Sequence, residues 1–238
     1  MTTEQTFDLS TSDGPMAVYE SRPDAPASRA VFVVQEAFGV NDHIEDVTRR
    51  FAQERYFAVA PAFFHRAGGG TAAYDDFANI RPLFEGLDDD AVLTDVDATL
   101  AYLHEQGFEN SSIGIVGFCF GGRVSFLVSA KRALGAGVGF YGGGIVAGGR
   151  GLGGPLHELA GGIRTPWLGL FGDLDANIPI DGVEQLRADL RGASVSTDVV
   201  RDPDAGHGFH CDHRADYHEP SATDAWDRTL AWFDTHLA

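Results

Sequence analysis

The sequence is poor in basic residues. Lys131 is its only lysine, and 17 Lys and Arg residues stand against 35 Asp and Glu residues, which gives the 238-residue chain a formal net charge of -18. Nucleic acids and anionic membranes are bound through clusters of basic side chains, so this balance predicts neither as a partner. An anionic small molecule would need a local arginine.

Long apolar runs and secretion signals are also missing. No uninterrupted apolar stretch approaches the roughly 18 residues that a membrane-spanning helix needs, and the N-terminus lacks a basic segment followed by an apolar one. We therefore expect a cytoplasmic protein. The two cysteines, Cys119 and Cys211, are too few for a disulfide framework, so we expect two free thiols.

Cofactor motifs are absent as well. The glycine-rich stretches 68–70 and 142–154 contain neither G-x-x-x-x-G-K-S/T nor a G-x-G-x-x-G followed by an acidic ribose ligand, so we expect no nucleotide cofactor. The run 207–213 concentrates histidine, cysteine and aspartate, which keeps a metal site open as an alternative. It lacks a second, distant pair of ligands and an H-E-x-x-H helix, so we expect no metal.

What the sequence does contain is a regular alternation of apolar strands and amphipathic helices. This alternation is typical of a mostly parallel sheet with helices on both faces, and it predicts an α/β fold in a single domain over residues 1–238. Residues 7–10 and 17–19 predict an antiparallel hairpin at the sheet edge. The expected strands are 30–35, 56–60, 113–116, 136–141, 167–171 and 195–200, and the expected helices include 43–55, 90–106, 122–132 and 222–236.

The most informative motif is Gly117-Phe118-Cys119-Phe120-Gly121-Gly122, which follows the strand 113–116. It matches the G-x-S-x-G nucleophile elbow, with cysteine in place of serine. Its glycines permit the sharp strand-to-helix turn that presents the central side chain, because larger residues would clash there. The motif alone leaves a second interpretation open, in which Cys119 is a buried core residue beside a glycine-rich turn.

A cysteine nucleophile needs a base to accept its proton and a carboxylate to orient that base. The segment 171–179 follows a strand and offers Asp173 and Asp175, and His207 lies between glycines after the last strand. The chain order of nucleophile, acid and histidine is that of α/β hydrolases. The sequence therefore predicts a catalytic triad with two candidates for the acid.

These segments resemble the dienelactone hydrolase family of the α/β-hydrolase fold over nearly the whole chain. Residues 35–39 (Q-E-A-F-G), the cysteine elbow and residues 206–209 (G-H-G-F) match three family segments. The family's Gly-x-x-Asp-x-x-x-Pro segment places the acid on Asp175, with Asp173 as the runner-up. The resemblance also implies that Glu36 acts as a gate, hydrogen-bonded to the resting thiol and displaced when substrate binds; a structural salt bridge is the alternative role.

The resemblance implies further site residues. The backbone N–H groups of Phe120 and Ala37 would form the oxyanion hole, and Tyr141 matches a family tyrosine near the site, with a core aromatic as the alternative. Family members that cleave dienelactones bind the substrate carboxylate with an arginine four residues after the histidine, where this chain has Cys211. A thiol cannot form that clamp. Arg81 is the expected replacement. Three other arginines stay open as candidates: Arg66, Arg123 and Arg214.

The expected function is cysteine-dependent hydrolysis of a lactone or ester through an acyl-thioester intermediate, similar to the activity of a carboxymethylenebutenolidase. The expected partner is thus a small-molecule lactone or ester. Two alternatives stay open. One is a non-catalytic protein of the same fold that binds or senses a small lactone, and the other is a general carboxylesterase without preference for a carboxylate.

Overall fold

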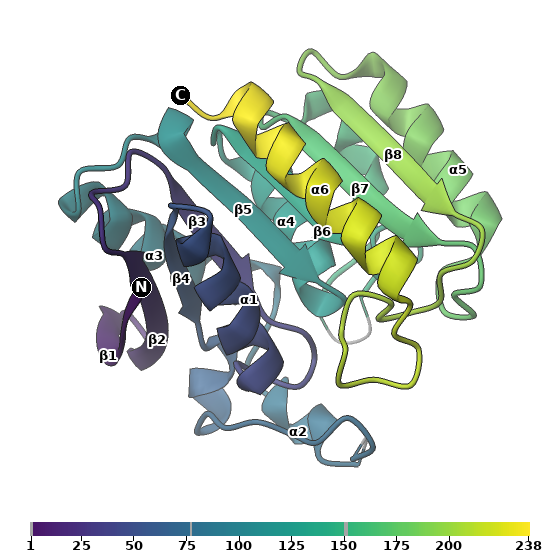
Figure 1. The fold of residues 1–238 in the computed structure, drawn as a ribbon. Helices are drawn as coiled ribbons and strands as arrows, with labels where there is room; N and C mark the ends of the chain where they lie inside the picture. Colours follow the sequence, from purple (N-terminus) through teal and green to yellow (C-terminus); the bar gives the residue numbers. More distant parts are fainter. Residues whose placement is uncertain (1, 77, 150–151) are drawn as a thin grey trace.

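The computed structural model describes residues 2–76, 78–149 and 152–238. Its centre is an eight-stranded sheet in the order β1-β2-β4-β3-β5-β6-β7-β8, and the six strands from β4 to β8 in that order are parallel (Figure 1). The mostly parallel α/β architecture predicted from the sequence is confirmed. The strands are β1 (Thr2–Thr11), β2 (Gly14–Pro23), β3 (Ala30–Val34), β4 (Phe57–Pro61), β5 (Ile113–Phe118), β6 (Ala136–Phe140), β7 (Trp167–Gly172) and β8 (Thr197–Asp202).

Helices cover both faces of the sheet. On one face lie α1 (Asp42–Gln53) and α6 (Glu219–His236), and on the other lie α3 (Asp89–Glu105), α4 (Phe120–Lys131) and α5 (Ile180–Asp189) (Figure 1). None of the described helices is both long and apolar enough to cross a membrane. The connections contain α2 (Ile80–Leu83) and four short 3-10 helices, η1 (Phe63–Ala67), η2 (Asn110–Ser112), η3 (His157–Gly162) and η4 (Leu190–Gly192).

The core forms two apolar layers, because successive side chains of a strand point to opposite faces of the sheet. In β3, Phe32 and Val34 contact the layer under α3, α4 and α5, whereas Val31 and Val33 contact the layer under α1 and α6. All four side chains are fully buried. This burial on both faces explains the continuous apolar runs in the sequence, and it fixes the carboxyl ends of the strands, where the elbow and the candidate acid lie.

The antiparallel hairpin predicted at the N-terminus is confirmed, and it is longer than expected. β1 and β2 pair along their whole length around a two-residue turn, after which Gly14 has a φ of 117°. β2 also pairs antiparallel with β4 and so joins the hairpin to the parallel strands. The expected ranges 7–10 and 17–19 were too short, because β1 is an edge strand whose mostly exposed polar residues carry little apolar pattern.

Other element boundaries differ from the expected ones by a few residues. The helix expected at 90–106 begins at Asp89, because the side chain of Asp88 caps it by accepting a hydrogen bond from Ala91 N at 2.8 Å. The strand expected at 195–200 lies at 197–202, and the last helix begins at Glu219. The short helices η1 and α2 were not predicted, since neither is long enough to show a helical period.

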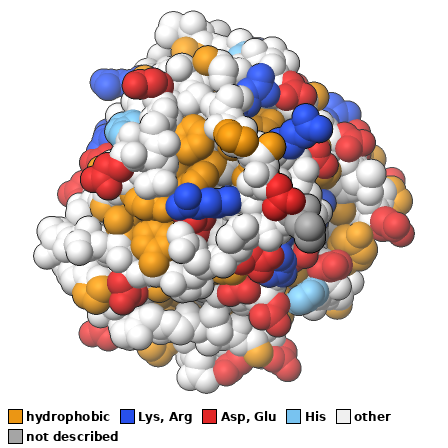
Figure 2. All heavy atoms as spheres, turned by 60° about the vertical axis from the view of Figure 1, so that its left-hand side comes forward, with side chains coloured by type: hydrophobic (Ala, Val, Ile, Leu, Met, Phe, Trp, Pro, Cys, Tyr) orange, Lys and Arg blue, Asp and Glu red, His pale blue; other side chains and the backbone are white. Residues whose placement is uncertain are grey.

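Acidic charge is spread over the surface of the molecule. Figure 2 shows Asp and Glu side chains around one face, whose centre is occupied by hydrophobic side chains with basic side chains lying across them. Among the described residues, four acidic side chains are buried instead: Glu20, Glu36, Asp95 and Asp175. Burying an unpaired charge is costly, so these four positions mark polar networks inside the fold.

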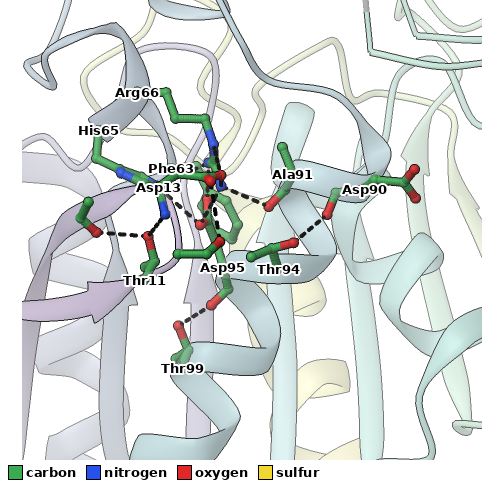
Figure 3. A network of polar contacts seen from close by, with 12 residues as sticks. Thr11, Asp13, Phe63, His65, Arg66, Asp90, Ala91, Thr94, Asp95 and Thr99 are labelled. Carbon is green, nitrogen blue, oxygen red and sulfur yellow. Dashed lines mark hydrogen bonds and ion pairs between the residues drawn. The ribbon is translucent and has the colours of Figure 1, made fainter.

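The network around Asp95 fastens η1 to α3 (Figure 3). The fully buried Asp95 carboxylate accepts hydrogen bonds from two guanidinium nitrogens of Arg66, at 2.6 and 2.9 Å, and lies 3.1 Å from Nε2 of His65. Arg66 also pairs with Asp13 in the hairpin turn. These contacts join η1 to α3 and to the hairpin. The segment that follows η1 then passes the loop after β3, and Ala72 N donates a hydrogen bond to Phe38 O there.

Replacing Asp95 tests this network. We expect Asp95→Asn to lower the free energy of unfolding by about 3 kcal/mol in urea denaturation, because it removes the buried counter-charge of the largely buried Arg66 guanidinium and leaves only the partly exposed Asp13. The matched control is Asp97→Asn on the same helix, whose pair with Arg132 is exposed and contributes at most about 1 kcal/mol. Equal losses in the two variants would contradict the role given to Asp95.

Candidate active site

The turn from β5 into α4 holds Cys119 in a strained conformation. Its φ of 53° and ψ of -109° lie outside the regions that residues other than glycine ordinarily occupy. Glycines make the turn possible: a Cβ on Gly117 would lie 2.9 Å from Gly121 Cα, and a Cβ on Gly121 would lie 2.7 Å from Gln35 O. Cys119 is only partly buried. The predicted elbow is therefore present, and it exposes the thiol rather than placing it in the core.

His207 lies between Cys119 and Asp175. Its Nε2 is 3.1 Å from the sulfur, and its Nδ1 is 2.6 Å from Asp175 Oδ2. Asp173, the other candidate acid, is held by Arg201, whose Nε and Nη2 donate to its two oxygens at 2.7 Å. Of the two aspartates, the structure thus brings Asp175 to the histidine and turns Asp173 toward β8.

The loop after β7 orients Asp175. Its second carboxylate oxygen, Oδ1, accepts a hydrogen bond from Asn177 N at 2.7 Å, and the side chain is almost fully buried. A carboxylate held from both sides keeps a proton on Nδ1 of His207 and leaves Nε2 facing the thiol. This is the tautomer that a base needs in order to take a proton from sulfur.

The electrostatics of the pair favour a charged histidine. Burial alone would lower the pKa of His207, but the hydrogen bonds to Asp175 and Cys119, together with their negative charges, outweigh it and raise the pKa to about 10. An imidazolium in contact with sulfur stabilises a thiolate. The arrangement therefore places a charged imidazolium 3.1 Å from the sulfur.

Glu36 lies beside this pair without bonding to it. Its carboxylate is fully buried, and burial raises its pKa, while Arg214 and Tyr74 act in the opposite direction. Oε1 accepts a long hydrogen bond of 3.5 Å from Arg214 Nη1, and Oε2 has no hydrogen-bond partner in the described part of the chain. In this structure the thiol bonds to His207, and Glu36 is paired with an arginine.

Arg214 is the candidate arginine that reaches the site. Its guanidinium lies directly over Gly208, where a Cβ would be 2.7 Å from Arg214 Cζ, so the glycine next to His207 makes room for it. The side chain is 13% exposed and can therefore still meet a ligand.

The other three arginines lie elsewhere. Arg66 pairs with Asp95 and Asp13, and Arg123 is buried against Asp89. Arg81 lies on the exposed surface of α2. Its binding of a substrate carboxylate stays a prediction, whereas Arg214 lies beside Glu36 and the glycine that follows His207.

The remaining predicted residues lie around the thiol. Phe120 is the first residue of α4, and Ala37 lies in the loop after β3 that contacts Gly121. Tyr141 is fully buried with a positive φ of 38°, and its ring centroid is 5.3 Å from that of His207. Its hydroxyl faces Glu36 but falls short of hydrogen-bond geometry, so it has no partner among the described side chains.

Tyr74 was missed from the sequence. The Tyr74 hydroxyl accepts hydrogen bonds from Asn41 Nδ2 at 3.1 Å and from the Cys211 thiol at 3.2 Å. Arg214 lies over its ring, 5.6 Å from the centroid. Tyr74 thus joins the segment after η1 to the surroundings of Glu36. Its segment has no motif, so only the fold reveals the contact.

The metal alternative finds no support in the geometry. His210, in the middle of the run 207–213, is buried between the rings of Phe118 and Trp226, and burial holds its pKa well below its usual value. Within residues 2–76, 78–149 and 152–238, no three His, Cys, Asp or Glu side chains are grouped in a way that could bind a metal ion.

Comparison with known proteins agrees with this geometry. The model of the dienelactone hydrolase family matches residues 16–237. A Salmonella typhimurium protein named "Putative carboxymethylenebutenolidase" is 41% identical over 227 residues, which cover 92% of this chain and 82% of that protein. A Pseudomonas putida protein named "Carboxymethylenebutenolidase" is 29% identical over 218 residues, 90% of this chain and 88% of that protein.

A solved structure is similar over its full length. The crystal structure from Klebsiella pneumoniae described as "Putative Dienelactone Hydrolase" has a TM-score of 0.91 and 37% identity, and the match covers 99% of this chain and 100% of that one. An elbow of this kind at the carboxyl edge of a mostly parallel sheet defines the class of α/β hydrolases. Within that class, the family match shows that this chain belongs to the dienelactone hydrolase family. It is accordingly an enzyme that hydrolyses esters or lactones.

The pair of Cys119 and His207 predicts a thiol that reacts at mildly acidic pH. A group with a raised pKa keeps its proton below that pKa, so His207 stays charged up to about pH 10, and a cation 3.1 Å from the sulfur favours nucleophilic attack by it. We expect iodoacetamide to alkylate Cys119 at about pH 6.5 roughly tenfold faster, or more, than in the His207→Asn variant.

Mass spectrometry identifies the alkylated residue in this experiment. Cys211 is the internal control, since burial raises its pKa to about 11 and should keep it unmodified. Equal alkylation rates of Cys119 in the two proteins would show that His207 does not activate the thiol.

Proposed function

We propose that the enzyme cleaves its lactone or ester with Cys119 as the nucleophile and passes through an acyl-thioester. The observation that carries this proposal is the position of His207, with one ring nitrogen 3.1 Å from the thiol and the other 2.6 Å from Asp175. A nucleophile, a base and a carboxylate that orients the base are the parts that acyl transfer requires.

In the first half-reaction the Cys119 sulfur attacks the carbonyl carbon. A C–S bond forms, and the carbonyl π electrons move to the oxygen. When this tetrahedral intermediate collapses, the C–O bond breaks, and the His207 imidazolium gives its proton to the leaving oxygen. In a lactone the leaving oxygen stays attached to the acyl group, so the ring opens without loss of a fragment.

In the second half-reaction water takes the place of the sulfur. His207 Nε2 accepts a proton from water while the water oxygen attacks the thioester carbon, and the C–S bond then breaks to return the thiolate. Both tetrahedral intermediates carry negative charge on oxygen. We assign its stabilisation to the N–H groups of Phe120 and Ala37, because the first N–H groups of a helix have no intrahelical acceptor and the approach of Gly121 to Gln35 O brings the two loops together.

The same site has groups that suit a substrate carboxylate. Arg214 is charged, is partly exposed and is bonded to Glu36 only by a long hydrogen bond. Tyr141 offers a buried hydroxyl that lacks a partner among the described residues. We propose that Arg214 binds a substrate carboxylate, that Tyr141 donates a hydrogen bond to the substrate, and that Glu36 gates the thiol as its pairing with Arg214 changes.

Two alternatives remain to be separated from this proposal. A protein that only senses a lactone needs no nucleophile, whereas here His207 contacts both Cys119 and Asp175. A general carboxylesterase would use the same triad, but its activity would not depend on Arg214. The two experiments that follow separate these cases.

Substitutions in the proposed triad test the chemistry. We expect Cys119→Ala to abolish hydrolysis of p-nitrophenyl acetate and of dienelactone while leaving the fold intact. We expect Asp175→Asn to lower kcat by roughly 10⁴-fold, because the histidine loses its tautomer, while Asp173→Asn keeps kcat within about threefold. Full activity of Cys119→Ala would rule out the thioester, and stoichiometric binding of lactone without turnover by the unmodified protein would indicate a sensor.

Substitution of Arg214 tests the substrate preference. We expect Arg214→Gln to lower kcat/KM for a lactone with a free carboxylate by roughly 10- to 100-fold, because it removes a charged hydrogen bond. We expect kcat/KM for the methyl ester of the same lactone to change far less. Arg81→Gln is the matched control on the exposed helix α2. A selective loss in Arg81→Gln instead would assign the carboxylate to Arg81, and equal losses on both substrates would point to a general carboxylesterase.

A further inference from the structure

A cleft of about 430 Å³ opens at the carboxyl edge of the sheet, between the loop after β6 and the beginning of α5. Its volume falls in the range of sites that hold small molecules. The side chains of both walls are mostly apolar, and they include Ile145 and Val146 on one side and Ile178, Val183 and Leu186 on the other.

Each wall of the cleft lies next to a residue of the proposed site. On one side, Gly142 directly follows Tyr141 and lies against the first turn of α4, where its Cβ would be 2.9 Å from Gly122 C. On the other side, Asn177 donates its backbone N–H to Asp175 Oδ1 at 2.7 Å. The cleft therefore borders the two loops that carry Tyr141 and Asp175, while Cys119 and His207 are not among the residues that line it.

The charge of the side chains that line the cleft differs in sign from the charge of Arg214. Of the described residues that line it, Asp181 carries the one charged side chain, and that charge is negative. A negative wall repels an anion, and the apolar side chains gain most when they cover hydrocarbon. Arg214 lies instead on the loop after β8, beside Glu36.

We propose that this cleft binds the uncharged hydrocarbon portion of the substrate, so that the enzyme takes esters or lactones with an apolar group of several carbons on one side of the scissile bond. This inference rests on the proposed function. It assigns the two ends of the substrate to different places: any carboxylate lies toward Arg214, and the hydrocarbon lies against Ile178 and Val183.

Gly182 offers a direct way to fill the cleft. It lines the wall on α5, and a Cβ at this position meets no other atom within 4 Å. Gly182 lies in the first turn of α5 without a positive φ, so a side chain here does not strain the backbone, and Gly182→Phe should fold. Gly182→Ala is the small-volume reference. Gly192→Phe, beyond the other end of α5 with equally open space, is the matched control.

The experiment compares two ester series, p-nitrophenyl acetate to hexanoate and ethyl to hexyl acetate. In the unmodified enzyme we expect kcat/KM to rise by roughly tenfold with chain length in at least one series, because each buried methylene adds to binding. We expect Gly182→Phe to remove this rise and Gly182→Ala and Gly192→Phe to retain it, and we expect Gly192→Phe to keep activity on the shortest ester within about threefold. A rise that persists in Gly182→Phe, or no rise in the unmodified enzyme, would overturn the proposal.

A binding measurement separates this inference from the proposed chemistry. Calorimetry of hexanamide with the Cys119→Ala variant reports on the cleft without turnover, and we expect adding Gly182→Phe to weaken binding by roughly tenfold. Unchanged binding would count against the cleft even if Cys119 is the nucleophile. Ester hydrolysis that survives in Cys119→Ala would refute the thioester mechanism but not the role of the cleft, since the cleft would still select the substrate.

Discussion

The structure of the site depends on one close approach between backbones, in which the first turn of α4 lies against the end of β3. Gly117 and Gly121 permit it, since a Cβ on either residue would meet backbone atoms of the neighbouring segment. The approach forces Cys119 to a positive φ and points its sulfur away from the sheet. It also sets the N–H groups at the start of α4 beside the loop that carries Glu36 and Ala37. The proposed nucleophile, the proposed oxyanion hole and the proposed gate thus share a single packing constraint.

The sheet and the three side chains at its carboxyl edge could be predicted because their signals are local. Strands buried on both faces appear as apolar runs. Cys119 has a glycine two residues away on each side, and His207 lies between two glycines. Asp175 could be separated from Asp173 only by the resemblance, and the structure separates them physically through Arg201, which engages Asp173. Short elements such as α2 have too few residues to show a period.

Arg214 and Tyr74 show why other parts of the site could not be predicted. The sequence places Arg214 seven residues after His207, but its approach to Glu36 depends on how residues 208–214 fold back over Gly208. Tyr74 reaches Cys211 across a sequence separation of 137 residues, through a segment without a motif. In both cases the contact results from tertiary packing of loops, for which neither periodicity nor turn chemistry gives a rule.

The position of β8 in the sheet has a consequence for how the enzyme loses activity. β8 is an edge strand that pairs with β7 as its one neighbouring strand, and the loop that carries His207 follows it directly. Edge strands open more readily than central ones, because half of their backbone groups face no neighbouring strand. The proposed base therefore follows an edge strand of the sheet, whereas Cys119 follows a central one. Heating should inactivate the enzyme by local fraying at this edge before the hydrophobic layers melt.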